Sequence, residues 1–365
     1  MPLLVPVLAA FGFAHGYDGA ARLVFVVFGA AVVLDLLCPR PATVSPVAAS
    51  AGAADGAAVT AAITTTPTRP WWLWLWLPTQ AALLAAAVHA VGLPGVDIVQ
   101  VLQDALAVGL IGGMLAAPAA HELLHARSRF ERGMAELLLV LLGASAFGVE
   151  HVGGHHRHVA TARDNATARA GESVYAFYCR AVFSGWRSAC RIEARRLRRF
   201  GHRVAGPGHR VLRGWVLTFA LGAGAAAWAG WRGALFVAVQ CAVAVLCIET
   251  INYVQHYGLL RTRLADGHHR RAGARDAWNA EPPVGNSLLL NLGHHSRHHM
   301  ESTVPFQRLA MEAGMPMLPT GLLGMCLLAL LPPLWFGVMD PRVRAWQQAE
   351  NAEKPCSHSI SRRNG

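Results

Sequence analysis

The sequence predicts an all-α integral membrane protein, with about six transmembrane helices and a histidine-rich cap on one side of the membrane. Of its 365 residues, 54% are hydrophobic and only 15% are charged, which leaves too little polar surface for an ordinary soluble domain. Apolar runs of membrane-spanning length recur along the chain, and many of the 18 histidines gather beside the ends of those runs.

Six apolar runs are expected to cross the bilayer, because a crossing takes about 20 residues. They form three pairs: residues 3–14 with 20–37, 71–91 with 101–120, and 211–230 with 234–257. The first run is short. The third begins with a tryptophan-rich stretch at 71–76 that suits the aromatic belt at a membrane interface.

The chain divides into four segments: a transmembrane hairpin at 1–40, a flexible Ala/Thr/Pro-rich linker at 41–70, a transmembrane and cytoplasmic domain with the histidines at 71–340, and a mobile polar tail at 341–365. The apolar run at 137–149 is too short to cross, so we expect it to dip into the bilayer or lie flat. Four prolines interrupt the run at 315–338 and predict a segment lying against the membrane.

The net charge of +11 is concentrated in arginine-rich stretches at 157–213 and 261–275. Such basic clusters occur in nucleic-acid-binding proteins, but a basic groove would need a soluble domain to carry it. Between apolar runs, short arginine-rich segments are typical of cytoplasmic loops. We therefore expect membrane lipid around the spans, a cytoplasmic cap and no nucleic-acid partner.

Four groups of histidines mark the candidate site. His121 and His125, in the pattern H-E-x-x-H, share one face of a helix. The other groups are His151, His155 and His156; His256; and His295, His298 and His299. An isolated histidine is more often a loop or core residue. Nine clustered imidazoles, however, exceed what one metal ion can bind, so the sequence predicts two metal ions.

These motifs resemble the membrane fatty-acid desaturase and hydroxylase superfamily, and within it the alkane 1-monooxygenases. The sequence E-H-V-G-G-H-H-R-H-V-A-T at 150–161 is similar to that family's E-H-x-x-G-H-H-x-x-V-A-T. N-Y-V-Q-H-Y-G-L at 252–259 is similar to its N-Y-x-E-H-Y-G-L. The likeness extends over about residues 72–342.

The resemblance implies a fatty-acid-desaturase-like fold and a non-haem di-iron centre whose two iron ions are held by the nine histidines. It implies a monooxygenase that uses O2 to hydroxylate the terminal methyl group of an alkane or similar apolar substrate taken from the bilayer, in a bacterial inner membrane. Two electrons would come from a rubredoxin-type donor. The seven cysteines form no C-x-x-C pair, so that donor is expected to be a separate protein.

Five polar residues are expected to support the histidine ligands: Glu150, Asp164, Asn252, Gln255 and Asn279. Gln255 departs from the family, which usually has Glu there, and Glu150 or Glu249 are candidate substitutes for that carboxylate. His294 replaces a common Arg. Four histidines match no family ligand position and are expected not to bind metal: His158, His268, His269 and His294.

Other functions fit parts of the pattern. Within the oxygenases, the alternatives are an aromatic methyl hydroxylase of the xylene type and a lipid desaturase. H-E-x-x-H also occurs in zinc proteases, with Glu122 as general base, although such a site needs only three protein ligands. A membrane metal transporter would place ionisable residues along its spans, where the sequence has little beyond His15, His89 and Asp35.

Overall fold

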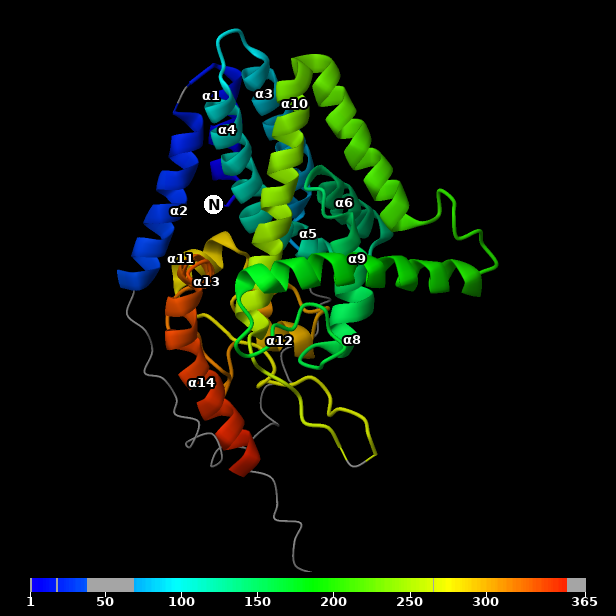
Figure 1. Cartoon of the computed structure of the whole chain (residues 1–365), viewed down its shortest axis with the longest axis vertical. Helices are drawn as coiled ribbons and strands as arrows, with labels where there is room; N and C mark the ends of the chain where they lie inside the picture. The colour runs from blue at the N-terminus through cyan, green and yellow to red at the C-terminus, as the bar shows by residue number, and fades with distance from the viewer. Residues whose placement is uncertain (1, 18, 38–68, 265, 353–365) are drawn as a thin grey trace, which may run out of the picture.

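The structure is a computed structural model that describes residues 2–17, 19–37, 69–264 and 266–352 (Figure 1). Within these residues the regular secondary structure is helical, apart from two isolated β-bridges, and loops connect the helices. Long apolar helices occupy one half of the molecule, and the other half holds α9 (Val174–Arg199), α12 (His295–Met300) and α14 (Pro332–Ala352) together with long loops (Figure 1). The expected linker at 41–70 lies outside the described residues except for Arg69 and Pro70.

The N-terminal hairpin consists of α1 (Leu4–Ala14) and α2 (Ala20–Leu37), which pack on α3 (Trp76–Gly92) and α4 (Ile98–Ile111) respectively. The tryptophan-rich turn η3 (Trp71–Leu75) leads directly into α3. Asp35, near the end of α2, is buried and accepts hydrogen bonds from the backbone N–H groups of Val284 and Gly285 at the start of α11 (Pro283–Leu288). The hairpin is thereby tied to the histidine-bearing half of the molecule.

The centre of the bundle is α10 (Arg210–His256), which is kinked at Ala229 and Gly230 into arms at 210–228 and 231–256. Gly230 has φ 63°, a left-handed conformation that glycine adopts without strain. The second arm packs closely on α4 and on the π turn η4 (Gly112–Ala116), because a Cβ on Gly113 would overlap Cys247. Small residues permit such close helix contacts in membranes.

Four helical stretches are long and apolar enough to cross a membrane: Ala20–Leu37, Trp71–Gly92, Ile98–Leu124 and Arg210–His256. The third combines α4, η4 and α5 (Ala117–Leu124), and α10 holds the last two expected apolar runs in its two arms. α1 is apolar but shorter. Long apolar helices of this kind are those of an integral membrane protein.

The helices outside those four apolar stretches include α6 (Arg129–Leu141), α7 (Ser145–Glu150), α8 (His156–His158), α9 (Val174–Arg199), α12 (His295–Met300), η6 (Phe306–Arg308), α13 (Leu322–Ala329) and α14 (Pro332–Ala352). The run at 137–149 is divided between α6 and α7, and the run at 315–338 is broken between α13 and α14. In both segments the apolar run is interrupted before it reaches spanning length.

The helix α14 extends beyond residue 341, where the sequence predicts a mobile tail. The Tyr257 hydroxyl donates to Asp340, and the Val343 side chain lies against Gly258, so the polar segment is held by contacts with the end of α10. Residues 341–352 therefore continue the helix. The remaining residues of the expected tail lie outside the described part of the chain.

Candidate metal centre

All nine histidines of the four sequence groups meet at one end of the bundle, where they form two neighbouring sets. The five-histidine group contains His121, His125, His151, His156 and His298. The four-histidine group contains His155, His256, His295 and His299. Within each set one ring nitrogen per histidine lies within 4.8 Å of all the others. Each set is a candidate site for one metal ion.

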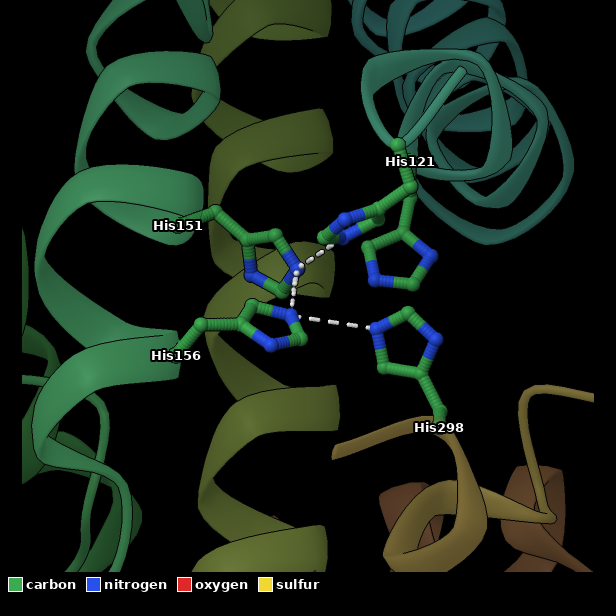
Figure 2. A group of neighbouring side chains, drawn as sticks. His121, His151, His156 and His298 are labelled. Carbon is green, nitrogen blue, oxygen red and sulfur yellow. Dashed lines mark hydrogen bonds between the residues drawn. The ribbon is translucent and has the colours of Figure 1, made fainter. Parts of the chain in front are cut away.

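The five-histidine group is connected through ring nitrogens (Figure 2). The Nε2 atom of His151 lies 3.2 Å from that of His125 and 3.0 Å from that of His156. His156 Nε2 lies 3.1 Å from His298 Nε2. The His121 ring packs against those of His151 and His298, with centroids 4.5 and 4.4 Å away, and its Nε2 is buried without a hydrogen-bond partner among the described residues.

The four-histidine group shows the same convergence. His295 Nε2 lies 3.0 Å from the Nε2 atoms of both His256 and His299, and His299 Nε2 lies 3.2 Å from that of His155. His256 is the last residue of α10, and His295 and His299 are one turn apart on α12. A long apolar helix and a short helix thus supply histidines to one set.

A π turn distributes the H-x3-HH motif between the two groups. Residues 151–155 form η5 (His151–His155), in which the hydrogen-bonded repeat is i→i+5. His151 and His156, five residues apart, therefore face the same set, whereas His155 faces the other. Gly154 lies under the Glu150 carboxylate, and a Cβ at this position would overlap it.

The spacing of the nitrogens fits metal coordination. Neighbouring Nε2 atoms in both groups lie 3.0–3.2 Å apart. With metal–nitrogen bonds of about 2.1 Å, two adjacent ligands of one ion are separated by roughly 3 Å. Imidazoles suit Fe and Zn alike, so the donor set fits iron.

Burial keeps these imidazoles in the form that binds metal. It lowers the pKa of His125 to about 3, and the nearby Arg69 guanidinium adds to the shift. Burial, reinforced by neighbouring imidazoles, also holds the pKa values of His151, His295 and His298 well below the usual range. Neutral imidazole is the form that coordinates a metal ion.

Among the five predicted supporting residues, Asp164 contacts a histidine ring directly. His155 Nδ1 lies 2.9 Å from Asp164 Oδ2, and both side chains are buried. Thr167, which the sequence did not single out, donates to the same oxygen at 2.6 Å. Burial acts to raise the pKa of Asp164, but His155 and the hydrogen bonds outweigh it and lower that pKa. The carboxylate therefore orients the imidazole.

The other predicted supporting residues bind the backbone or other side chains near the histidines. Asn279 Oδ1 accepts from the Ser296 backbone N–H at 2.9 Å and so fixes α12. Gln255 Nε2 donates to the Leu292 carbonyl at 2.7 Å, just before α12. Two further amides bind carboxylates: Asn165 Nδ2 donates to Glu150 and Asn252 Nδ2 donates to Glu249.

The Glu122 side chain forms a buried ion pair. Its Oε1 lies 2.7 Å from Nε of Arg69, and the two side chains are 6% and 7% exposed. Arg69 was not among the predicted functional residues; its one signal in the sequence was a positive charge at the end of the linker, just before the tryptophan-rich turn. A paired Glu122 beside more than three histidines does not match a zinc protease, in which the corresponding Glu is the general base.

Four histidines expected not to bind metal lie outside both groups: His158, His268, His269 and His294. His294 directs its Nδ1 to the Leu309 carbonyl at 2.8 Å. His268 and His269 are exposed on the loop that follows α10. The structure therefore brings together the nine predicted ligands and leaves these four apart.

Two cavities reach the histidines. The α5 cavity, about 30 Å³, lies between α5 and α10 and is lined by histidines of both groups, His121, His151 and His295, and by apolar residues such as Ala117 and Ile251. The α9 cavity, about 140 Å³, lies between α7, α9 and α10. Apart from the histidines, the wall of the α5 cavity is mainly apolar.

The fold and the site define an all-helical protein in which two buried histidine groups suited to metal ions lie at one end of the long apolar helices. The family model described as fatty acid desaturase matches residues 98–326, which include all nine histidines.

Three curated relatives are similar over most of the chain. Alkane 1-monooxygenase 1 of Pseudomonas aeruginosa is 40% identical over 260 residues, covering 69% of this chain and 68% of the relative. Alkane 1-monooxygenase of Pseudomonas putida is 35% identical over 277 residues, or 76% and 69%. The hydroxylase component of xylene/toluene monooxygenase from Pseudomonas putida is 29% identical over 357 residues, or 94% and 89%. The chain belongs to the fatty acid desaturase family, among its alkane 1-monooxygenase members.

Proposed function

We propose that the protein is a membrane di-iron monooxygenase that hydroxylates the terminal methyl group of an alkane or a similar apolar molecule. The observation that carries this proposal is the convergence of nine histidines into two adjacent groups, in a chain related to alkane 1-monooxygenases. The overall reaction converts a C–H bond, O2, two electrons and two protons into an alcohol and water.

The five-histidine group would hold one iron ion and the four-histidine group the other. When bound, the irons supply the activation of O2. The protein's own contribution is to orient the imidazoles, as Asp164 does for His155, and to keep the site dry.

The α5 cavity is evidence for an apolar substrate that reacts at the end of its chain. Its volume of about 30 Å³ is close to that of one water-sized group, so it accommodates the end of a chain rather than its whole length. Ile248 and Ile251 supply apolar wall from α10, and the histidines of both groups lie on the same wall. A terminal methyl group is the part of an alkane that fits such a space.

The membrane arrangement that we propose has six spans, counting α1 and the two arms of α10. The histidine-bearing end is cytoplasmic, because exposed arginines of α9, such as Arg187 and Arg191, lie there. An acidic rubredoxin-type protein, supplying two electrons, would complement this basic surface. A catalytic end that faces the cytoplasm fits a bacterial inner membrane, which is the membrane that we propose.

An aromatic methyl hydroxylase is the second candidate. The relative named as a xylene/toluene monooxygenase component covers 94% of this chain, although at lower identity than the alkane 1-monooxygenases. A methyl group on a ring would also fit the α5 cavity, so the choice depends on the space available to the rest of the substrate.

The test is metal analysis of the detergent-purified protein beside turnover of octane and of xylene, with a rubredoxin-type donor and a reductant. We expect about two irons per chain and 1-octanol as the main product. A new double bond in the product would indicate a desaturase. Zinc at one ion per chain, without hydroxylation, would contradict the proposal.

A further inference from the structure

The two cavities beside the histidines differ in the chemistry of their walls. They share Phe147, His151, Ile248 and Asn252, so they lie next to each other. The α5 cavity is bounded mainly by apolar side chains. The α9 cavity has two carboxylates, Glu150 and Glu249, at its histidine end. A polar wall of this kind is unsuited to the end of a hydrocarbon chain.

The polar wall of the α9 cavity has hydrogen-bonding capacity to spare. Asn165 Nδ2 donates to Glu150 Oε1 at 2.7 Å, and Asn252 Nδ2 donates to Glu249 Oε2 at 3.2 Å. Asn252 therefore binds one of the two Glu249 oxygens, and Glu150 Oε2 is buried without a hydrogen-bond partner among the described residues. Because Glu249 lies on a helix long and apolar enough to span a membrane, its position there is costly unless a partner or a function compensates.

The outer part of the same cavity is apolar. Val182 and Trp186 on α9 face Trp215 and Val245 on α10. The rings of Trp186 and Trp215 stack with centroids 5.5 Å apart. Val182 and Trp215 are 39% and 37% exposed, so the cavity opens at the surface between α9 and the first arm of α10. In Figure 1, α9 crosses α10 near the histidine-bearing end of the bundle.

We propose that the α9 cavity binds the product of the reaction, a primary alcohol, with its hydroxyl group at Glu249 and its chain passing between Trp186 and Trp215. This inference depends on the proposed hydroxylase function. The cavity of about 140 Å³ holds roughly four or five water-sized groups. It therefore receives the hydroxyl end of the chain while the remainder extends into the bilayer.

Hydrogen bonding gives this cavity its preference for an alcohol over an alkane. The alcohol hydroxyl donates to Glu249 Oε1, whereas an alkane in the same place would exclude water from the carboxylate and replace it with nothing. Leaving a buried polar group unsatisfied costs about 1–3 kcal/mol, which corresponds to a preference of roughly five- to 150-fold. The product hydroxyl thus moves from the apolar α5 cavity into the adjacent α9 cavity, where carboxylates line the wall.

The test uses two photoreactive probes, a primary alcohol carrying an aliphatic diazirine near its hydroxyl and the matching hydrocarbon without the hydroxyl. Each is bound to the iron-loaded protein without reductant, so that no turnover occurs. Trypsin cleavage after Arg180 and Arg187 releases the peptide 181–187, which holds Val182, Gly185 and Trp186 of the cavity wall. We expect the alcohol probe to label this peptide about tenfold more than the hydrocarbon probe.

Two variants and one control make the result specific. Gly185→Leu fills the α9 cavity, because the nearest atom to a Cβ there is 4.0 Å away on Glu150; we expect labelling by the alcohol probe to fall about tenfold. Glu249→Leu should make the two probes label equally. Gly133→Leu on α6, also open around its Cβ, is the matched control and should label as the unmodified protein does.

Equal labelling of the unmodified protein by both probes would overturn the inference, whatever the variants do. So would undiminished labelling of Gly185→Leu. Iron content and octane hydroxylation are measured on the same preparation. Octanol formation with equal labelling rejects the product site alone, whereas absence of both iron and octanol rejects the proposed function.

Discussion

The five-histidine group and the four-histidine group differ in how their rings are held. Both groups contain histidines from the segment at 151–156 and from α12. The four-histidine group has a carboxylate, Asp164, in direct contact with one ring, and Thr167 binds that carboxylate in turn. Among the described residues, no carboxylate lies within hydrogen-bond distance of a ring in the five-histidine group.

The five-histidine group is also the less buried of the two. His125 and His156 are partly exposed in the five-histidine group, whereas His299 is the partly exposed member of the four-histidine group. From this comparison we propose that the five-histidine group depends on the number of its histidines, and the four-histidine group on the residues that orient them. Removing a single side chain should therefore have unequal effects on the two groups.

Replacement of one ligand in each group tests this comparison and should give the largest effect. His155→Ala leaves three histidines in its group and removes the partner of buried Asp164, so we expect hydroxylation to fall about 1,000-fold, with loss of about one iron per chain. His125→Ala leaves four ligands, and we expect a loss of about tenfold. The measurements are iron per chain and the initial rate of octanol formation.

The control for both variants is His294→Ala, which lies outside the two groups and should retain two irons and nearly normal hydroxylation. Equal losses in the His155 and His125 variants would remove the proposed difference between the groups. Normal activity of His155→Ala would remove this residue from the ligands.

The Arg69–Glu122 ion pair is the second test, because it lies beside the five-histidine group. Arg69→Met leaves Glu122 buried and unpaired, which should cost about 3 kcal/mol of stability. We expect a clearly lower Tm in a thermal unfolding assay. Combining Arg69→Met with Glu122→Leu removes both charges and should recover most of the loss. A double variant as unstable as the single one would show that packing, rather than the unpaired charge, is responsible.

Asp164→Asn should have a smaller effect, confined to the four-histidine group. Asn keeps the size of the side chain but not its charge, so His155 loses its carboxylate partner. Removal of such a partner typically costs 10–100-fold in metal affinity or activity, roughly 1.4–2.7 kcal/mol. Anaerobic iron titration of the metal-free protein should show one weakened site out of two. Weakening of both sites would mean that the groups are not independently supported.

Sequence patterns predicted the structure correctly where it depends on the regular repeat of an α-helix. The apolar runs reappear as long helices, and His121 and His125, four residues apart, face the same group. The same α-helical rule would place His151 with His155, but the π turn pairs His151 with His156 instead. The turn depends on Gly154 fitting beneath Glu150, a contact that spacing alone does not reveal.

Contacts between distant segments could not be predicted. Asp35 binds the backbone at Gly285, 250 residues later, and its sequence signal was only a charge within an apolar run. The segment after residue 341 was predicted to be mobile because it is polar, but contacts of Asp340 and Val343 with Tyr257 and Gly258 continue the helix. Tertiary contacts of this kind override local composition.

Replacement of Gln255, the residue that differs from the Glu usual in the family, should have the smallest effect. Its Nε2 donates to the Leu292 carbonyl at 2.7 Å, while Oε1 is buried without a hydrogen-bond partner among the described residues. A carboxylate cannot donate to that carbonyl, so Gln255→Glu should lose one hydrogen bond worth about 1 kcal/mol. We expect a slightly lower Tm and a several-fold decrease in octanol formation, measured at equal iron content.

Gln255→Leu is the matched comparison for this variant, since it loses the same hydrogen bond to Leu292 without adding a charge. If the amide acts only by holding the segment before α12, the Glu and Leu variants should have similar rates. A rate for Gln255→Glu above that of the unmodified protein would show that the site benefits from a carboxylate at this position. The present arrangement, with the amide bound to Leu292, would then be a partly impaired form of the family's centre.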